Sequence, residues 1–149
     1  MNLHKEWIIF VTAGKWQLNG IRIAKKLGLS VLSIDTNPLA DGKKYSDIFI
    51  CCDLNNHNII LKKIIKLNIN ISGVISYCSE AGMQLSSILR YHFKLFGPSK
   101  KVTNILTNKF LQRKFLSKLN IYNPKWFLCK NFNEALSNSK KFDNYFIIK

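Results

Sequence analysis

A glycine-containing turn is the first place along the chain where the residue types could bind an anion. The apolar run Trp7–Val11 leads to Gly14 and then, through Gln17 and Leu18, into a helical pattern. A turn at a helix N-terminus offers unpaired backbone N–H groups to an anion. Larger residues replace the close-approach glycines of the dinucleotide fingerprint, so classical NAD binding is not predicted. An anion site and an ordinary strand-to-helix turn both remain open.

Two acidic residues follow predicted strands. Asp35 closes the second strand, where a Rossmann domain has its ribose-binding acid, and a capping or loop-stabilising role is an equal alternative. Glu80 follows the fourth strand, at the end of a parallel sheet where ligands bind. An acid in a first helical turn also suits the helix dipole, but we favour the ligand role for Glu80. Cys78 has no nearby His or Asn and is interpreted as a half-buried structural cysteine.

Basic residues near the end of the chain are candidates for phosphate contacts. Lys109 and Arg113 lie one helical turn apart and share a face. They could hold phosphates or form a solvated face, and composition alone favours the solvated face. Lys149 follows the apolar run Tyr145–Ile148.

The elements that position these residues alternate along residues 1–98. Strands are predicted at 7–11, 30–34, 47–51, 71–77 and 93–96, and helices at 17–27, 55–67 and 80–89. Continuous apolar strands separated by amphipathic helices indicate a parallel sheet with helices on both faces. The predicted fold class is therefore α/β, with a Rossmann-like domain over residues 1–98.

Residues 99–149 have a different pattern. Helices are predicted at 100–106, 108–119 and 131–141, and strands at 126–129 and 145–148. Asn131 and Glu134 have the spacing of a capping box. A last strand without a following partner would expose its edge, so we expect further chain to complete an α+β subdomain.

Composition excludes several classes of protein. The 149 residues are 47% hydrophobic, which argues against disorder, and the net charge is +15. Lys, Asn, Ile, Phe and Tyr are all abundant, and the lysines are scattered, so we favour A/T-rich codon usage over selected polyanion binding. The four cysteines form no CxxC pair, and no targeting or membrane segment is evident. A cytoplasmic location is expected.

Several segments, taken in order, carry a resemblance to a known family. They are Asn19–Gly28, Val31–Pro38, Ala40–Gly42, Tyr45–Asp47, Val74–Glu80, Phe96–Ser99, Asn108–Lys109 with Arg113, Leu119–Pro124 and Phe146–Lys149. Their order and spacing resemble the ATP-grasp superfamily, in particular the large chain of carbamoyl-phosphate synthetase and the purine-biosynthetic ligases. The resemblance covers essentially the whole chain.

The resemblance implies the N-terminal portion of an ATP-dependent carboxylate–amine ligase that acts through an acyl phosphate. The expected cofactor is ATP, with Mg²⁺ bound in full-length members by ligands that this chain does not contain. The expected partners are ATP and a small carboxylate or amine substrate, with no specific nucleic acid and no membrane, and a homodimer is left open. By position, the resemblance assigns ATP binding to Lys109 and Lys149, and substrate binding to Gly14, Gln17, Leu18 and Glu80.

Some positions depart from the family pattern. Asn108 replaces the usual aspartate, and Asn120 replaces the usual glycine. The family's glycine-rich phosphate loop and its metal-binding carboxylates would follow Lys149, so we expect this chain alone not to catalyse ligation. Two alternatives remain: a stand-alone Rossmann-like module that binds a nucleotide or small anion, and a basic nucleic-acid-binding protein.

Overall fold

A computed structural model of the chain describes residues 5–119, 121–142 and 145–148. The chain forms two compact units, Met1–Thr107 and Asn108–Lys149. Helix α4 (Lys100–Thr107) packs against α3 (Met83–His92) and so belongs to the first unit. The boundary at residues 98 and 99 that the sequence suggested stays a prediction.

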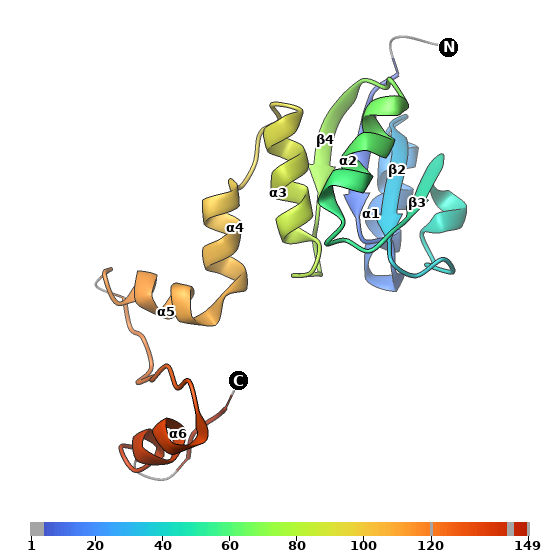
Figure 1. Cartoon of the computed structure of the whole chain (residues 1–149). Helices are drawn as coiled ribbons and strands as arrows, with labels where there is room; N and C mark the ends of the chain where they lie inside the picture. Colours follow the sequence, from blue (N-terminus) through green and yellow to red (C-terminus); the bar gives the residue numbers. More distant parts are fainter. Residues whose placement is uncertain (1–4, 120, 143–144, 149) are drawn as a thin grey trace. The chain divides into compact units, whose positions relative to one another are not determined.

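The first unit is built on a four-stranded parallel sheet with the order β3-β2-β1-β4 (Figure 1). Its strands are β1 (Trp7–Val11), β2 (Ser30–Asp35), β3 (Ile48–Cys51) and β4 (Ile71–Ile75). The central strand β1 is a continuous apolar run, and every residue of its neighbour β2 is buried, as expected for strands covered on both faces. Helix α1 (Leu18–Lys26) connects β1 to β2, and α2 (His57–Lys66) connects β3 to β4. Helix α2 thus carries the chain from one sheet edge to the other.

Helices cover both faces of this sheet, which confirms the predicted α/β class. Successive side chains of β1 point to opposite faces. Ile9 and Val11 belong to the core cluster formed with α2 and α3, whereas Phe10 packs with Ile21 and Ala24 of α1 on the other face.

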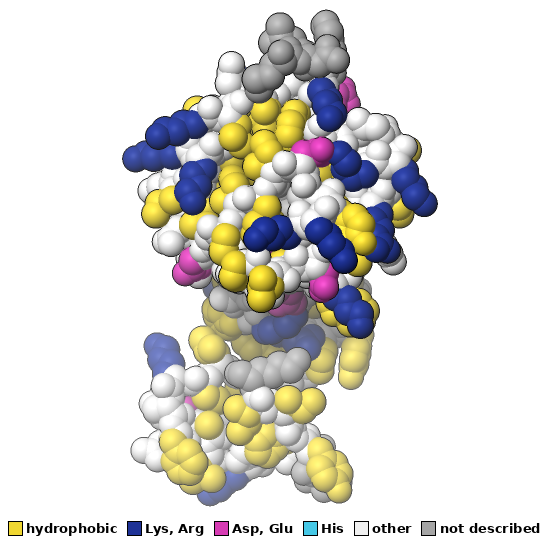
Figure 2. All heavy atoms as spheres, turned by 90° about the vertical axis from the view of Figure 1, so that its right-hand side faces the viewer, with side chains coloured by type: hydrophobic (Ala, Val, Ile, Leu, Met, Phe, Trp, Pro, Cys, Tyr) yellow, Lys and Arg dark blue, Asp and Glu magenta, His cyan; other side chains and the backbone are white. Residues whose placement is uncertain are grey.

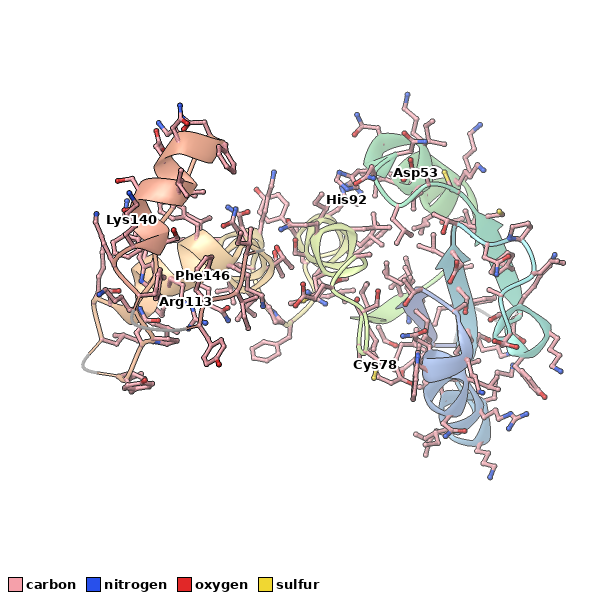
Figure 3. The ribbon with its side chains drawn as sticks, turned by 90° about the horizontal axis from the view of Figure 1, so that it is seen from below. Asp53, Cys78, His92, Arg113, Lys140 and Phe146 are labelled. Atoms are coloured by element: carbon pink, nitrogen blue, oxygen red, sulfur yellow. The ribbon has the colours of Figure 1, made fainter. Side chains whose placement is uncertain are left out.

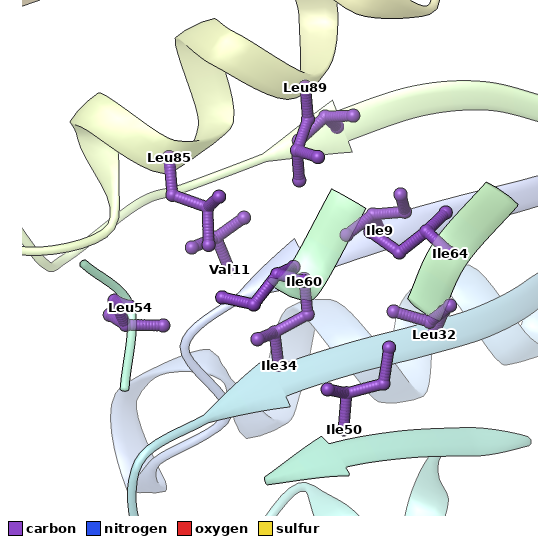
Figure 4. Packing of buried hydrophobic residues seen from close by; sticks show 11 residues of the cluster. Ile9, Val11, Leu32, Ile34, Ile50, Leu54, Ile60, Ile64, Leu85 and Leu89 are labelled. Carbon is purple, nitrogen blue, oxygen red and sulfur yellow. The ribbon is translucent and has the colours of Figure 1, made fainter. Parts of the chain in front are cut away.

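The larger core lies between the sheet and the pair α2 and α3 (Figure 4). Ile60 and Ile64 of α2 and Leu85 and Leu89 of α3 are fully buried, and each pair has the i, i+4 spacing of one helical face. Full burial of one such side chain stabilises the fold by roughly 1.5–3 kcal/mol. This core fixes the sheet, and the sheet fixes where the loops at its carboxyl ends begin.

Two sequence-based expectations for this unit are wrong. The predicted strand at 93–96 is instead the end of α3: the Phe93 N–H donates to Leu89 O, and Lys94 has a positive φ of 53°. That turn prevents residues 93–96 from running beside β4. The predicted helix from Glu80 begins only at Met83, so Glu80 lies in the preceding loop.

A buried arginine lies where a further strand would have paired with β4. Arg90 is 8% exposed, and its guanidinium donates to Val74 O (3.1 Å) and Pro98 O (3.3 Å). Burial lowers the pKa of Arg90. Gly97, with φ of 139°, passes so close that a Cβ there would lie 2.7 Å from Arg90 Cδ. Arg90 thus joins the sheet edge to the connection that leads into α4.

We predict that Gly97→Ala destabilises the protein more than Gly28→Ala does. Both glycines have positive φ, which costs a side chain about 1–2 kcal/mol. A Cβ at Gly28 has open space, whereas one at Gly97 must also displace Arg90. Urea unfolding of the two variants measures the difference, and equal losses of unfolding free energy would show that the Arg90 contact is unimportant.

Asp47, directly before β3, joins α1 to the start of β2. Asp47 accepts from Lys25 Nζ (2.6 and 2.7 Å) and from the Val31 N–H (2.7 Å). Burial raises the pKa of Asp47, but the hydrogen bonds from Lys25 and Val31 together with the Lys25 charge outweigh it, and the net pKa is lowered. Because the folded state prefers the charged form, this stabilisation is complete above the ordinary carboxyl pKa and is lost as pH falls through the lower folded value.

We predict that Asp47→Asn lowers the unfolding free energy by about 1 kcal/mol at pH 7, since both partners are partly exposed. The difference from wild type should shrink as the pH falls below about 3.8, where half of the Asp47 carboxyl groups are protonated in the unfolded chain. Denaturant unfolding between pH 2.5 and 7 tests this, with the exposed Asp41→Asn as control. A difference that is constant with pH would contradict the ion-pair interpretation.

The second unit contains two short helices, α5 (Lys109–Leu116) and α6 (Phe132–Ser139), and neither has a buried residue. The cap at Asn131 is confirmed, because Asn131 Oδ1 accepts from the Glu134 N–H (2.9 Å). The Glu134 side chain reaches back one residue further than a capping box requires, and its Oε2 accepts from the Lys130 N–H (2.8 Å). Residues 126–129 and 145–148 were expected to be strands and are not. A strand requires a hydrogen-bonded neighbour, and neither segment pairs with another in the described part of the chain.

Candidate functional site

Asp35 fixes the chain as it leaves the sheet. Its Oδ2 accepts from the Ala13 N–H (2.7 Å) after β1, and its Oδ1 accepts from the Asn37 N–H (2.8 Å) after β2. Asp35 is 9% exposed, so these bonds replace water. Because both carboxylate oxygens already bind backbone amides, the geometry favours the loop-stabilising role over a ribose-binding one.

The Ala13 peptide is held from its other side as well. Ala13 O accepts from the Gly42 N–H (2.7 Å) in the loop after β2. A Cβ on Gly42 would lie 2.8 Å from Ala13 O and 2.5 Å from Ile21 Cδ1, so only glycine allows this approach. The turn that begins at Gly14 therefore starts from a fixed point.

The turn itself is a short 3₁₀ helix, η1 (Lys15–Gln17), followed directly by α1. The Gln17 N–H donates to Gly14 O (3.0 Å), and the Gln17 side chain is 4% exposed. Lys15 is exposed and Trp16 is 77% exposed. The predicted substrate residues of this turn thus divide into a buried amide at Gln17 and the half-buried Gly14 and Leu18.

Tyr77, which sequence reasoning missed, joins this turn to the loop after β4. Gln17 Nε2 donates to Tyr77 O (2.7 Å), and the Tyr77 hydroxyl donates to Gln17 O (2.9 Å). The Gly20 N–H donates to the same hydroxyl (3.0 Å). The only advance signal was Gly20 itself, because an isolated glycine in a helical pattern often marks a close contact.

The loop after β4 carries Glu80 and Cys78, and both side chains are exposed. Cys78 was expected to be half-buried, which is wrong: its φ of 56° belongs to a turn that faces outward. Figure 3 shows Cys78 beside the start of α1, as the Gln17–Tyr77 bonds require. The structure therefore brings the Gly14–Leu18 turn and the Glu80 loop to neighbouring positions at one sheet end.

The predicted ATP-binding lysines belong to the second unit. Lys109 is exposed at the first position of α5, after Asn108, whose Oδ1 accepts from the Leu111 N–H (3.1 Å). Lys149 lies outside the described residues. Arg113, which shares the Lys109 face in the helical pattern, instead exchanges hydrogen bonds with Asn123 (3.1 Å each) and ties α5 to the following segment.

On the face drawn in Figure 2, the basic side chains do not form one stripe. Figure 2 shows Lys and Arg separated by uncharged and apolar side chains on the visible face. Some are occupied locally: Arg22 Nη2 donates to the Tyr45 hydroxyl (2.6 Å), and this hydrogen bond lowers the pKa of Tyr45. Such dispersal fits general basic composition better than a track for nucleic acid.

The remaining features of the described residues suggest no other binding site. A hollow of about 330 Å³ is lined by Asn55–Ile59 at the start of α2, but a single turn of chain forms it and no predicted site residue lines it. Within residues 5–119, 121–142 and 145–148, no group of three His, Cys, Asp or Glu side chains could hold a metal ion. Among the same residues, no helix is long and apolar enough to cross a membrane.

Comparison with known proteins shows what fold this is. No family model and no curated protein sequence matches the chain. Among solved structures, the chain is similar to phosphoribosylglycinamide synthetase from Anaerococcus prevotii, with a TM-score of 0.73 and 19% identity, over 94% of this chain and 35% of the other. The chain has the fold of the N-terminal part of ATP-grasp ligases.

Two other ATP-grasp structures support this conclusion. N5-carboxyaminoimidazole ribonucleotide synthetase from Thermotoga maritima has a TM-score of 0.66 and 22% identity, over 89% of this chain and 36% of its own. The Staphylococcus aureus N5-carboxyaminoimidazole synthetase, complexed with ADP, has a TM-score of 0.60 and 14% identity, over 80% and 32%. The chain therefore spans about a third of the length of these ATP-grasp enzymes, and the resemblance noted in the sequence is confirmed at the level of the fold.

We predict that Asp35→Ala lowers the unfolding free energy of the first unit by about 2–3 kcal/mol, because two amides, one of them buried, lose a charged acceptor. The matched variant is Asp53→Ala, which removes an exposed carboxylate that also accepts from a backbone amide two residues on. Its expected loss is below about 1 kcal/mol. Urea unfolding measures both, and similar losses of unfolding free energy would show that Asp35 stabilises the loops no more than an exposed carboxylate does.

Proposed function

We propose that the chain is the N-terminal portion of an ATP-dependent carboxylate–amine ligase that acts through an acyl phosphate. The observation that carries the proposal is the fold match to enzymes named as synthetases, one of them complexed with ADP. The agreement of fold with motif order supports it, since ligases of this type keep their substrate loops at the carboxyl ends of the strands.

The substrate half of the proposal concerns Gly14, Gln17, Leu18 and Glu80. Three of these lie in one turn, and Glu80 lies in the loop that Tyr77 joins to that turn. Backbone N–H groups at a helix start and one exposed carboxylate suit a small ligand with both anionic and amine groups. We therefore assign the small carboxylate or amine substrate to this sheet end.

The ATP half concerns Lys109 and Lys149. A lysine ammonium near transferring phosphates offsets negative charge, which is what bound ATP would require from these residues. Lys109 is exposed at a helix start and fits that chemistry. Among the described residues no group of three His, Cys, Asp or Glu side chains could hold a metal ion. The resemblance implies that the ligands of Mg²⁺ lie outside this chain.

Two further parts of the proposal stay predictions. The first is that the 149-residue chain alone does not turn over ATP. Release of phosphate from ATP in the presence of carboxylates would contradict it. The second is the cytoplasmic location. The alternative is a stand-alone Rossmann-like module for a nucleotide or small anion, which is favoured if a nucleotide binds the first unit without any contribution from Lys109.

Lys109→Ala tests the assignment of ATP. We predict that ATP binds this variant about tenfold more weakly than wild type, because one charge-assisted contact to phosphate is lost. Isothermal titration with ATP measures the affinity. The matched control is Lys118→Ala, which removes another exposed lysine of the same unit and should leave the affinity unchanged.

Three outcomes of this titration distinguish the ATP-grasp assignment, a general charge effect and the stand-alone module. A selective loss at Lys109 supports the ATP-grasp assignment. Equal losses in both variants indicate a general charge effect, which should also weaken steeply with salt. Wild-type binding that neither variant changes would remove Lys109 from the ATP site and favour the stand-alone module.

A further inference from the structure

We propose that Tyr77 is a positioning residue that sets the orientation of the Gln17 amide and makes the two substrate loops move as one. This inference rests on the proposed function, because it concerns the substrate site assigned above. Tyr77 itself is not assigned to any ligand. Its action on a substrate is through Gln17.

Two reciprocal hydrogen bonds join Gln17 to Tyr77, in segments that are 60 residues apart in the sequence. The Gln17 side chain donates to the Tyr77 main chain, and the Tyr77 side chain donates to the Gln17 main chain. Each residue therefore holds the other's backbone. A shift of either loop would break both bonds, so the loops are coupled more strongly than a single bond would allow.

The two hydrogen bonds between Gln17 and Tyr77 also determine which side-chain atom of Gln17 is left to face a ligand. Its Nε2 is committed to Tyr77 O at 2.7 Å, and a flipped amide would set two oxygens against each other. Gln17 Oε1 is thereby directed toward the turn, 3.4 Å from where a Cβ on Gly14 would lie. A ligand that approaches Gln17 from the Gly14 side meets an acceptor, which favours an amine or hydroxyl group over a carboxylate.

Packing keeps the tyrosine in place. Its ring meets Phe10 edge-on, with centroids 6.4 Å apart. On the other side, a Cβ at Gly20 would lie 2.4 Å from the Tyr77 hydroxyl oxygen. Glycine inside a helix costs about 0.5–1 kcal/mol relative to alanine, so the glycine in α1 is explained by the room that Tyr77 needs.

The test is Tyr77→Phe, which keeps the ring and removes the hydroxyl. Hydrogen exchange should speed up in both segments 14–20 and 76–82, and the two Gln17 side-chain amide signals should shift in NMR spectra. Ribose 5-phosphate is the binding probe, because the names of two similar structures refer to phosphoribosyl or ribonucleotide compounds. We expect about a fivefold to tenfold weaker binding, the effect of about one misplaced hydrogen bond.

Two controls separate positioning from stability. Tyr91→Phe removes a hydroxyl from a side chain that is 88% exposed, and it should change neither the exchange nor the binding. Ile60→Val loosens the core on the opposite face by about 0.5–1.5 kcal/mol without touching the loops. If Ile60→Val weakens ribose 5-phosphate binding as much as Tyr77→Phe does, the effect is stability alone and the proposal is wrong.

A second variant removes the hydrogen bond that the Gln17 side chain donates to Tyr77. Gln17→Met keeps the length of the side chain and removes its amide, and it should speed exchange in segment 76–82. Unchanged exchange in that segment, in both variants, would overturn the coupling. If exchange responds as expected but wild type does not bind ribose 5-phosphate, the coupling of the two loops stands, and ribose 5-phosphate is ruled out as a ligand of this sheet end.

Discussion

The carboxylate of Asp35 is the contact on which the site depends. Strands of a parallel sheet end at the same edge, but the loops that leave them have no ladder to follow. Asp35 joins the loops after β1 and β2, because one carboxylate oxygen accepts from the Ala13 N–H and the other accepts from the Asn37 N–H. From that point Ala13 is fixed, the Gly14 turn has one starting place, and Gln17 comes within reach of Tyr77.

Glycines mark how tightly these loops are packed. Gly20, Gly42 and Gly82 each lie where an added Cβ would come within 2.4–2.5 Å of another side chain. All three are in or beside loops at the carboxyl ends of the strands, and Gly82 also lies against Val11 O. Side chains are excluded there because backbone and ring atoms already fill the space, so the shape of the sheet end is set by close backbone approach.

The alternating elements were predictable because local pattern decides them. Local hydrophobic pattern predicts the strands from Trp7 and Ser30 and the helix with Ile60 and Ile64 on one face. The spacing of Asn131 and Glu134 predicts the cap at Asn131. The resemblance also pointed to Gln17 and Glu80, and the structure brings their loops together at one end of the sheet. Their roles toward a ligand stay predictions.

Most of what the sequence did not predict depends on partners that are distant along the chain. Residues 126–129 have the composition of a strand, but composition cannot supply the neighbour that a strand pairs with. Tyr77 could not be found because its partners are about 60 residues away, and a tyrosine after a strand has no distinguishing pattern. The strand expected at 93–96 failed for a local reason, since Lys94 adopts a positive φ that ends α3 in a turn.

Arg90 has a consequence for how the molecule behaves in a crowded solution. An open sheet edge is a template on which another chain can add a strand and start aggregation. β4 is such an edge in the first unit, and the Arg90 guanidinium donates to Val74 O of this strand and to Pro98 O. The guanidinium therefore protects this edge, because a strand from another chain would have to displace a buried cation before it could hydrogen-bond to β4.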